Sequence, residues 1–332
     1  MKIGLLDVDG HGGFPNFALM RSSAYLKSKG HDVEWARPDT HYDEIWASKV
    51  FTFTPDVHWE AYDADTTRKG GTGYDIKGRL PEEIERSPLM DYTLYPDCDY
   101  SLQFFSRGCI RKCPFCLVRD KEGYICPVDP VDLNPNGKWI EILDNNFFAN
   151  PKWRDAADYL YDRKQMVNFH GVDIRIMDDE QAACLNRLRH KSCIHIAWDI
   201  PSADLRPQLE AALRHIKPSK LRCYVLIGFN STFEQDLHRV RTLKSYGIMP
   251  FVQPYRDYEN KRIPTQYEKD FARWANNLWF IKTHDFLDFE PRKGFCCKEY
   301  VTHPELRSMP SVKEKKSARA IVAEKAQLSL ML

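Results

Sequence analysis

The chain of 332 residues is long enough for about two domains of ordinary size. Its 43% hydrophobic and 29% charged residues suit a globular protein with a full core, and its formal net charge of +1 argues against a strongly basic nucleic-acid clamp or an acidic disordered tail. No apolar run approaches the roughly 18 residues of a membrane span, and the first residues do not follow the signal-peptide pattern. We therefore expect a cytoplasmic protein without a membrane partner.

The first hundred residues have the pattern of a small α/β unit. KIGLLDV (2–8) is a short apolar run, typical of a buried parallel strand, and residues 17–29 carry apolar side chains at helical spacing. Further strands are predicted over 31–36 and 43–51. This order of elements predicts an α/β fold that starts with a Rossmann-like domain, which with its linker occupies residues 1–100.

The second half of that segment, residues 52–100, lacks a regular apolar period. It contains the glycine-rich stretch KGGTG (69–73) and several proline-containing turns. We expect loops and short turns there, and no further strand.

A regular alternation of strands and helices begins near residue 101. Strands are predicted over 101–105, 138–144, 167–175, 193–199, 220–229 and 248–255, and helices over 152–163, 178–190, 204–216, 232–246 and 265–282. Six such units predict a partial (βα)6 TIM-type barrel over 101–285, followed by a C-terminal extension (286–332) that ends in a basic helix. In folds of this kind, the chemistry takes place at the carboxyl ends of the strands.

Three of the ten cysteines lie within eight residues, in the segment SRGCIRKCPFCLVRD. Cys109, Cys113 and Cys116 have the spacing C-x3-C-x2-C, and clustered thiols in a reducing compartment indicate a metal site rather than disulfides. Three thiolates without a fourth ligand in the loop suit an iron–sulfur cube with one open iron, because structural zinc and ordinary electron-transfer clusters use four protein ligands.

Two alternatives to an open cluster follow from a fourth ligand. Zinc completed by Cys98, Cys126 or a histidine would indicate a zinc-stabilised nucleic-acid-binding module. A cluster with four cysteines would indicate an iron–sulfur electron-transfer or scaffold protein.

The cysteine motif resembles that of the radical S-adenosylmethionine (radical SAM) enzymes, in which an aromatic residue, here Phe115, precedes the last cysteine. The resemblance implies a [4Fe-4S] cluster on Cys109, Cys113 and Cys116 and an open iron that chelates S-adenosylmethionine. Reductive cleavage of that cofactor yields a 5′-deoxyadenosyl radical, and an electron donor such as flavodoxin or ferredoxin is then expected. The resemblance identifies neither the substrate, small or macromolecular, nor the subclass, which includes methyltransferases and methylthiotransferases.

The same resemblance implies residues of the S-adenosylmethionine pocket. Phe115 is expected near the adenine. Asp144, Asn145 and Asn146 lie at the end of the second strand of the barrel, where the family carries a Gly-Gly-Glu-like motif that binds the methionine amino group. Gly228 lies in the fifth-strand motif, where backbone approaches the adenine in the family. A plain turn glycine is the alternative for Gly228.

Arg175, at the end of the third strand, is expected to bind the methionine carboxylate through two hydrogen bonds. The alternative for Arg175 is an ion pair with Asp178 or Asp179. Trp198 and Asp199 end the fourth strand and are expected to line the ribose or substrate pocket. The alternative for Asp199 is a helix N-cap.

Radical SAM enzymes often carry an N-terminal cobalamin-binding domain, and residues 1–95 resemble a trimmed version of it. The stretch Asp9-Gly10-His11-Gly12-Gly13 is close to the cobalamin motif D-x-H-x-x-G, so cobalamin is an additional candidate cofactor. A glycine-rich turn, or a phosphate or nucleotide site, is the alternative. Cys296 and Cys297 are interpreted as buried or incidental thiols, or as thiols with an auxiliary role.

Overall fold

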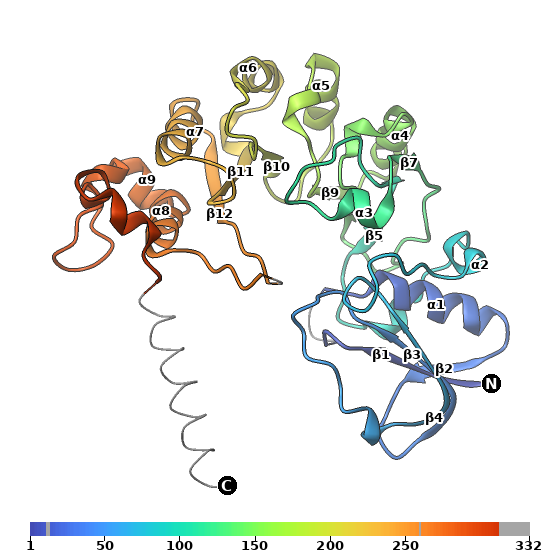
Figure 1. Cartoon of the computed structure of the whole chain (residues 1–332). Helices are drawn as coiled ribbons and strands as arrows, with labels where there is room; N and C mark the ends of the chain where they lie inside the picture. The colour runs from blue at the N-terminus through green and yellow to red at the C-terminus, as the bar shows by residue number, and fades with distance from the viewer. Residues whose placement is uncertain (11–13, 259, 312–332) are drawn as a thin grey trace, which may run out of the picture. The chain divides into compact units, whose positions relative to one another are not determined.

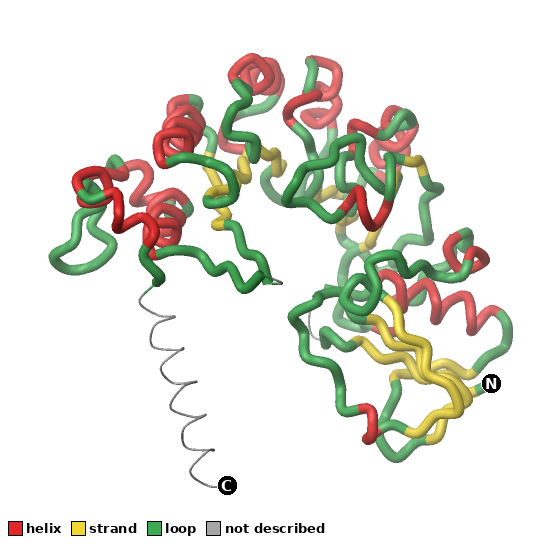
Figure 2. The backbone as a smooth tube through the Cα atoms, viewed as in Figure 1, coloured by secondary structure: helices red, strands yellow, loops and turns green. Residues whose placement is uncertain are grey.

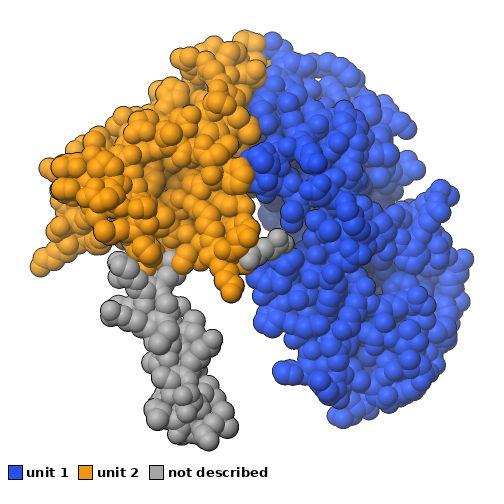
Figure 3. Space-filling model, viewed as in Figure 1, with its two compact units in different colours: residues 1–194 blue, residues 195–332 orange. Residues whose placement is uncertain are grey.

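The structure is a computed structural model that describes residues 1–10, 14–258 and 260–311. The chain divides into two compact units, residues 1–194 and residues 195–332 (Figure 3). Each unit is described by itself. The predicted basic helix at the C-terminal end lies outside the described residues, and so does His11.

A four-stranded parallel sheet opens the first unit (Figure 1). Its strands are β1 (Lys2–Asp7), β2 (Asp32–Trp35), β3 (His41–Ser48) and β4 (Asp63–Gly70), in the order β2-β1-β3-β4. The helix α1 (Phe17–Ser28) connects β1 to β2. This part therefore has the predicted α/β class.

The helix α1 begins and ends at residues that favour helix termini. The side chain of Asn16 accepts a hydrogen bond from the Leu19 N–H at 3.2 Å, as an N-cap does, and Gly30 follows the last turn with a φ of +83°. Leu19 and Met20 pack with Ile3 of β1 in one buried cluster. Each such side chain contributes about 1.5–3 kcal/mol by its burial.

The strand β4 corrects the prediction that residues 52–100 hold no strand. Its sequence, DADTTRKG, has no apolar alternation, and most of its side chains are exposed. β4 is an edge strand held by backbone pairing with β3, so its sequence needs no buried face.

A second parallel sheet in the first unit has the order β5-β8-β9. Its strands are β5 (Ser101–Gln103), β8 (Trp139–Ile142) and β9 (Met166–Phe169), and the helices that follow β8 and β9 are α4 (Trp153–Arg163) and α5 (Asp179–Arg187). The strand predicted over 167–175 therefore stops at Phe169. Figure 2 shows these strands and helices alternating along the chain.

A small antiparallel hairpin interrupts the connection from β5 to β8. It pairs β6 (Ser106–Arg107) with β7 (Cys126–Pro127), and the chain between the two strands carries the three clustered cysteines and the helix α3 (Val118–Glu122). The helix α2 (Glu82–Glu85) precedes β5.

The second unit contains most of a three-stranded sheet of order β10-β11-β12. Its strands are β10 (Ile194–Ala197), which begins at the last residue of the first unit, β11 (Leu221–Ile227) and β12 (Met249–Pro254). The helices are α6 (Arg206–His215), α7 (Phe233–Ser245), α8 (Gln266–Ala275), α9 (Leu278–Thr283) and α10 (Glu299–Thr302). The helix α7 packs on β11 and β12, and α8 packs on β12 (Figure 1).

The single helix predicted over 265–282 is wrong, because the chain forms α8 and α9 there. Asn277 accepts hydrogen bonds from the N–H groups of Trp279 and Phe280 and so starts a new helix. The side chain of Asn276 bonds both backbone groups of Val252 in β12, which holds the break against the sheet. In the part of the chain that the structure describes, no helix is long and apolar enough to span a membrane.

Candidate functional site

The cysteine loop is anchored at its first cysteine. The Cys109 N–H donates to the Gly123 carbonyl at 3.3 Å, which closes the loop on the end of α3. Gly108 has a φ of +79°, and a Cβ there would collide with the carbonyls of Gly123 and Tyr124. Glycine is therefore required directly before Cys109.

The carboxylate of Glu122 joins three segments around the loop. It accepts from Arg107 Nη2 at 2.6 Å, from the Gly108 N–H at 2.8 Å and from Asn145 Nδ2 at 2.9 Å. Asn145, expected in a cofactor pocket, thus holds the loop to the turn after β8. Glu122 lies outside the cysteine motif and was not among the predicted site residues.

Hydrogen-bond donors lie beside the first thiol, and an arginine lies near the second. Cys109 Sγ lies 3.4 Å from the Arg111 backbone nitrogen and 3.9 Å from Asn146 Nδ2. Burial lowers the pKa of Arg175, but the carboxylate of Asp173 and the neighbouring Cys113 outweigh burial, so the pKa of Arg175 is raised.

Asp173 gathers the side chains that contact those thiols. Its carboxylate, 7% exposed, accepts from Arg111 Nε at 3.1 Å, from Arg175 Nε at 2.6 Å and from Asn146 Nδ2 at 3.2 Å. Burial raises the pKa of Asp173, but the two guanidinium groups outweigh it and the pKa is lowered. Two arginines share this carboxylate, so the group as a whole carries a positive charge.

Arg175 therefore pairs with Asp173. Asp178 instead caps α5, where it forms a capping box with Gln181. The signal for Asp173 was present in the sequence as an aspartate two residues before Arg175, at the N-cap of a short turn.

Asp144 is 2% exposed and is bound to the chain that enters the hairpin. Its Oδ1 accepts from the Phe105 N–H at 2.8 Å, and its Oδ2 accepts from the Ser106 hydroxyl. Burial is the main influence on this carboxyl and raises its pKa to about 6.

Asn146, 1% exposed, is the most unusual residue of the turn after β8. Its Nδ2 bridges Cys109 and Asp173, whereas its Oδ1 is buried and has no hydrogen-bond partner among the described residues. A buried acceptor without a donor costs about 1–3 kcal/mol. The Asn146 Oδ1 atom is therefore an acceptor that a donor placed beside it could satisfy.

Zinc and an iron–sulfur cube require different distances between their sulfur ligands. Among residues 1–10, 14–258 and 260–311, no three His, Cys, Asp or Glu side chains are grouped to hold one metal ion. Sulfur atoms around one zinc lie about 3.8 Å apart, given Zn–S bonds of about 2.3 Å. Sulfur atoms bound to different irons of a cube lie further apart, so a cube does not need such a group. Phe115, between the second and third cysteines, is partly buried.

The residues expected to follow the fourth strand lie in the second unit. Trp198 is 1% exposed and donates from Nε1 to the Ala203 carbonyl at 3.0 Å. Asp199 Oδ1 accepts from the Leu226 N–H at 3.1 Å and links β10 to β11. The N-cap of α6 is Leu205, so Asp199 does not cap that helix.

Gly228 directly follows β11 with a φ of +75°. A Cβ there would overlap Glu268 Oε1 and lie 2.6 Å from Arg262 Nη2. Arg262 and Glu268 form an ion pair at 2.6 Å. Glycine therefore lets an ion pair lie directly on the backbone at the end of β11.

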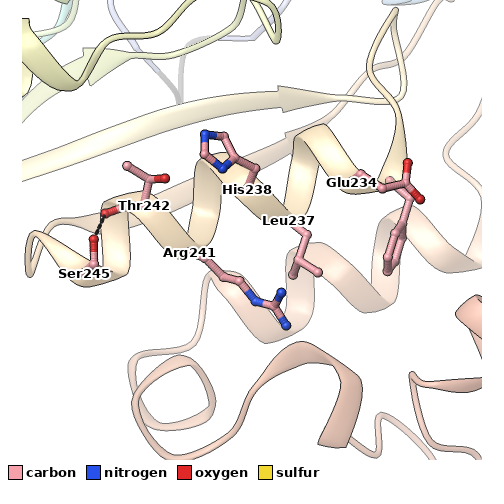
Figure 4. A pocket seen from close by; sticks show the side chains of 7 residues that line it. Glu234, Leu237, His238, Arg241, Thr242 and Ser245 are labelled. Atoms are coloured by element: carbon pink, nitrogen blue, oxygen red, sulfur yellow. Dashed lines mark hydrogen bonds between the residues drawn. The ribbon is translucent and has the colours of Figure 1, made fainter.

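A shallow groove of about 460 Å³ lies elsewhere in the second unit, along α7 (Figure 4). It is lined by Phe233, Glu234, Leu237, His238, Arg241, Thr242 and Ser245. Arg241 pairs with Asp285 at 2.6 Å, and the Ser245 hydroxyl donates to the Thr242 carbonyl at 2.8 Å. The groove follows a helix surface, and its polar groups do not converge on one point.

The two cysteines of the C-terminal extension lie apart from the cysteine loop in sequence and belong to the second unit. Cys296 Sγ lies 3.0 Å from the Leu287 carbonyl oxygen. Cys297 is fully buried, and burial raises the pKa of its thiol. All ten cysteines are among the described residues, and they form no disulfide.

Comparison with known proteins adds no relative to this geometry. No protein-family profile matches the chain, and no curated protein is detectably similar to it in sequence. The arrangement around Cys109, Asn146 and Asp173 is therefore interpreted from its own chemistry.

Proposed function

We propose that the protein is a radical SAM enzyme in which Cys109, Cys113 and Cys116 hold a [4Fe-4S] cluster, acting on a substrate that is not identified. The observation that carries the proposal is the pair of N–H donors at Cys109 and the arginine beside Cys113, in a loop that follows the first strand of a parallel sheet. When bound, the cluster with S-adenosylmethionine supplies a 5′-deoxyadenosyl radical.

The chain's own residues suit thiolate ligands. The Arg111 N–H and the Asn146 side chain donate towards Cys109, and Arg175 lies near Cys113. Hydrogen bonds to ligating sulfurs make the thiolates easier to hold and set the reduction potential of a cluster. Their role in this proposal is to keep the sulfurs charged and oriented.

The same residues suit the amino-acid end of S-adenosylmethionine. The unpartnered Oδ1 of Asn146 is an acceptor for an ammonium group. The positive charge left on the Arg111–Arg175–Asp173 group suits a carboxylate. Asp144 and Asn145 are hydrogen-bonded to other parts of the chain, at Phe105 and Glu122. Asn146 and Arg175 are therefore the stronger candidates for contact with the cofactor.

The identity of the domains and the electron donor belong to the same proposal. The first sheet represents a Rossmann-like domain (1–100), residues 101–285 a partial (βα)6 barrel, and residues 286–332 an extension. The alternation of parallel strands and helices in each unit supports this division. We further expect a flavodoxin or ferredoxin as electron donor. Cobalamin binding stays a prediction, since His11 of its motif lies outside the described residues.

Anaerobic reconstitution with iron and sulfide tests the proposal. We expect about four irons per chain and, after reduction in the presence of S-adenosylmethionine, formation of 5′-deoxyadenosine. Cys113→Ala should lose both, whereas Cys126→Ala, at an exposed thiol of β7, should keep both. Circular dichroism should show that both variants remain folded.

Three outcomes would contradict the proposal. One zinc and no iron per chain would favour the zinc-binding module. Four irons with no change in the cluster spectrum on addition of S-adenosylmethionine would favour the four-cysteine scaffold. Product formation by Cys113→Ala would remove that cysteine from the ligand set.

A further inference from the structure

Lys49 is a buried lysine at the carboxyl edge of the first sheet. It directly follows β3, and its N–H donates to the Gly70 carbonyl at the end of β4 at 3.0 Å. The residue is only 8% exposed, and its Cγ lies beneath Gly73, where an added Cβ would be 2.6 Å away. Lysines are seldom buried to this extent unless their charge is paired.

The ammonium of Lys49 has no counter-charge in the part of the chain that the structure describes. Its Nζ makes no hydrogen bond or ion pair there and lies 5.5 Å from the centre of the Tyr74 ring. The Nζ atom is not fully buried, so the tip of the side chain reaches solvent. The stem is covered, and the tip is presented at the edge of the sheet.

The nearby carboxylates at this edge have other hydrogen-bond donors. Asp7, at the end of β1, accepts from the Tyr95 hydroxyl at 2.9 Å. Asp9 accepts from the Val50 N–H and from the Thr54 hydroxyl, the latter at 2.6 Å. Neither carboxylate forms an ion pair with Lys49.

A glycine turn beside Lys49 offers backbone donors. The turn follows β4, and Gly71 has a φ of +93° with no room for a Cβ against the Lys49 carbonyl. The Gly73 N–H donates to that carbonyl at 2.8 Å, whereas the N–H groups of Gly71 and Thr72 have no hydrogen-bond partner among the described residues. Successive unpaired N–H groups in a turn of this kind form a concavity that suits an anion.

Aromatic side chains flank the same turn. The Phe51 carbonyl is 2.7 Å from where a Cβ of Gly73 would lie. Phe51 and Phe53 stack with ring centres 5.2 Å apart, yet they are 50% and 52% exposed. Exposed stacked rings offer a flat apolar surface to a second aromatic system.

The position in the sheet is where α/β proteins bind ligands. Strand order β2-β1-β3-β4 places β2 and β3 on opposite sides of β1. Open parallel sheets bind ligands outside the carboxyl ends of the strands where the order reverses in this way. Lys49 follows the strand on one side of that point.

We propose that this edge binds a nucleoside phosphate, with the phosphate on Lys49 and the N–H groups of Gly71 and Thr72, and the base on Phe51 and Phe53. The inference is independent of the proposed cluster, which involves other residues. It can therefore be tested on the full chain as purified, without iron.

Isothermal titration calorimetry with ADP, adenosine and inorganic phosphate tests this site. We expect ADP to bind at least about tenfold more tightly than adenosine or phosphate alone, since charged hydrogen bonds each contribute about 1.5–3 kcal/mol. Lys49→Met keeps the unbranched stem and should weaken ADP binding at least about tenfold. Lys69→Met is the matched control, because Lys69 Nζ lies 5.6 Å from the same Tyr74 ring but is exposed and paired with Asp56 at 3.8 Å.

A second variant tests binding of the base separately from binding of the phosphate, and it keeps the proposal testable if Lys49→Met does not fold. Phe51→Ala should weaken ADP binding and leave phosphate binding unchanged. Equal ADP affinity in Lys49→Met and wild type, or no ADP binding at millimolar concentration, would overturn the proposal. Phosphate binding as tight as ADP binding would overturn the assignment of the base to the two phenylalanines.

Discussion

Asp144 offers a quantitative test of how the cysteine loop is held. Its carboxyl is almost completely buried and has a pKa of about 6, against an ordinary value of 3.8. Asp144→Asn keeps the shape, because the amide oxygen can accept from the Phe105 N–H and the amide nitrogen can donate to the Ser106 hydroxyl. The substitution removes the charge and leaves the hydrogen bonds.

The expected magnitude follows from the pKa. A folded-state pKa above the unfolded value means that the folded chain binds the proton more tightly, so this carboxyl lowers stability as pH rises. The penalty is about 1 kcal/mol at pH 4.5 and about 3 kcal/mol at pH 7.5, from a shift of about two pKa units at 1.36 kcal/mol each. The stability of Asp144→Asn relative to wild type should therefore increase by about 2 kcal/mol from pH 4.5 to pH 7.5.

Urea denaturation of both proteins at several pH values measures this change. The comparison is between variant and wild type at each pH, so titration of all other groups cancels. Asp158→Asn is the control, because Asp158 is 70% exposed and its surface ion pair with Arg187 contributes little to stability. An equally flat response of Asp144→Asn would refute the assignment of a buried, charged carboxylate at the start of the loop.

Two further predictions concern the second unit, each measured by thermal and urea denaturation. Arg239→Met should lower the free energy of unfolding by about 3–5 kcal/mol, because Arg239 is fully buried and its loss leaves Asp236, 2% exposed, without a counter-charge. The double variant that also carries Asp236→Leu should recover most of this stability, and failure to recover it would contradict the charge argument. Gly228→Ala should lower the free energy of unfolding by at least about 1 kcal/mol more than Gly294→Ala does. Both glycines have a φ of +75°, but only Gly228 faces Glu268. Equal losses of stability would contradict the predicted clash.

The sequence was sufficient where local and tertiary signals agree. Strand β11 alternates buried and partly buried side chains along LRCYVLI, and the predicted strand over 220–229 contains it. Helix α7 begins at Thr232, which forms a capping box with Gln235, so its predicted start is nearly right. In these elements the apolar period and the caps point to the same structure.

Sequence-based prediction failed where an element depends on interactions with distant parts of the chain. β4 is specified by its pairing with β3 rather than by its own pattern. The break between α8 and α9 depends on Asn276 binding β12, which no local rule contains. The three cysteines were visible as a motif, but the residues that surround them, Asp173 and Glu122, became evident only from the contacts of their carboxylates.

The two candidate sites of the first unit share one segment of chain, residues 72–79. Lys77 Nζ and Arg79 Nη2 donate to the carbonyls of Asp120 and Lys121 in α3, and Lys121 Nζ donates back to the Thr72 hydroxyl. Thr72 belongs to the turn proposed to bind phosphate, and α3 closes the cysteine loop through the neighbouring Glu122. If the turn binds a phosphate as proposed, the Lys121–Thr72 hydrogen bond would transmit part of that restraint to α3 and the end of the cysteine loop.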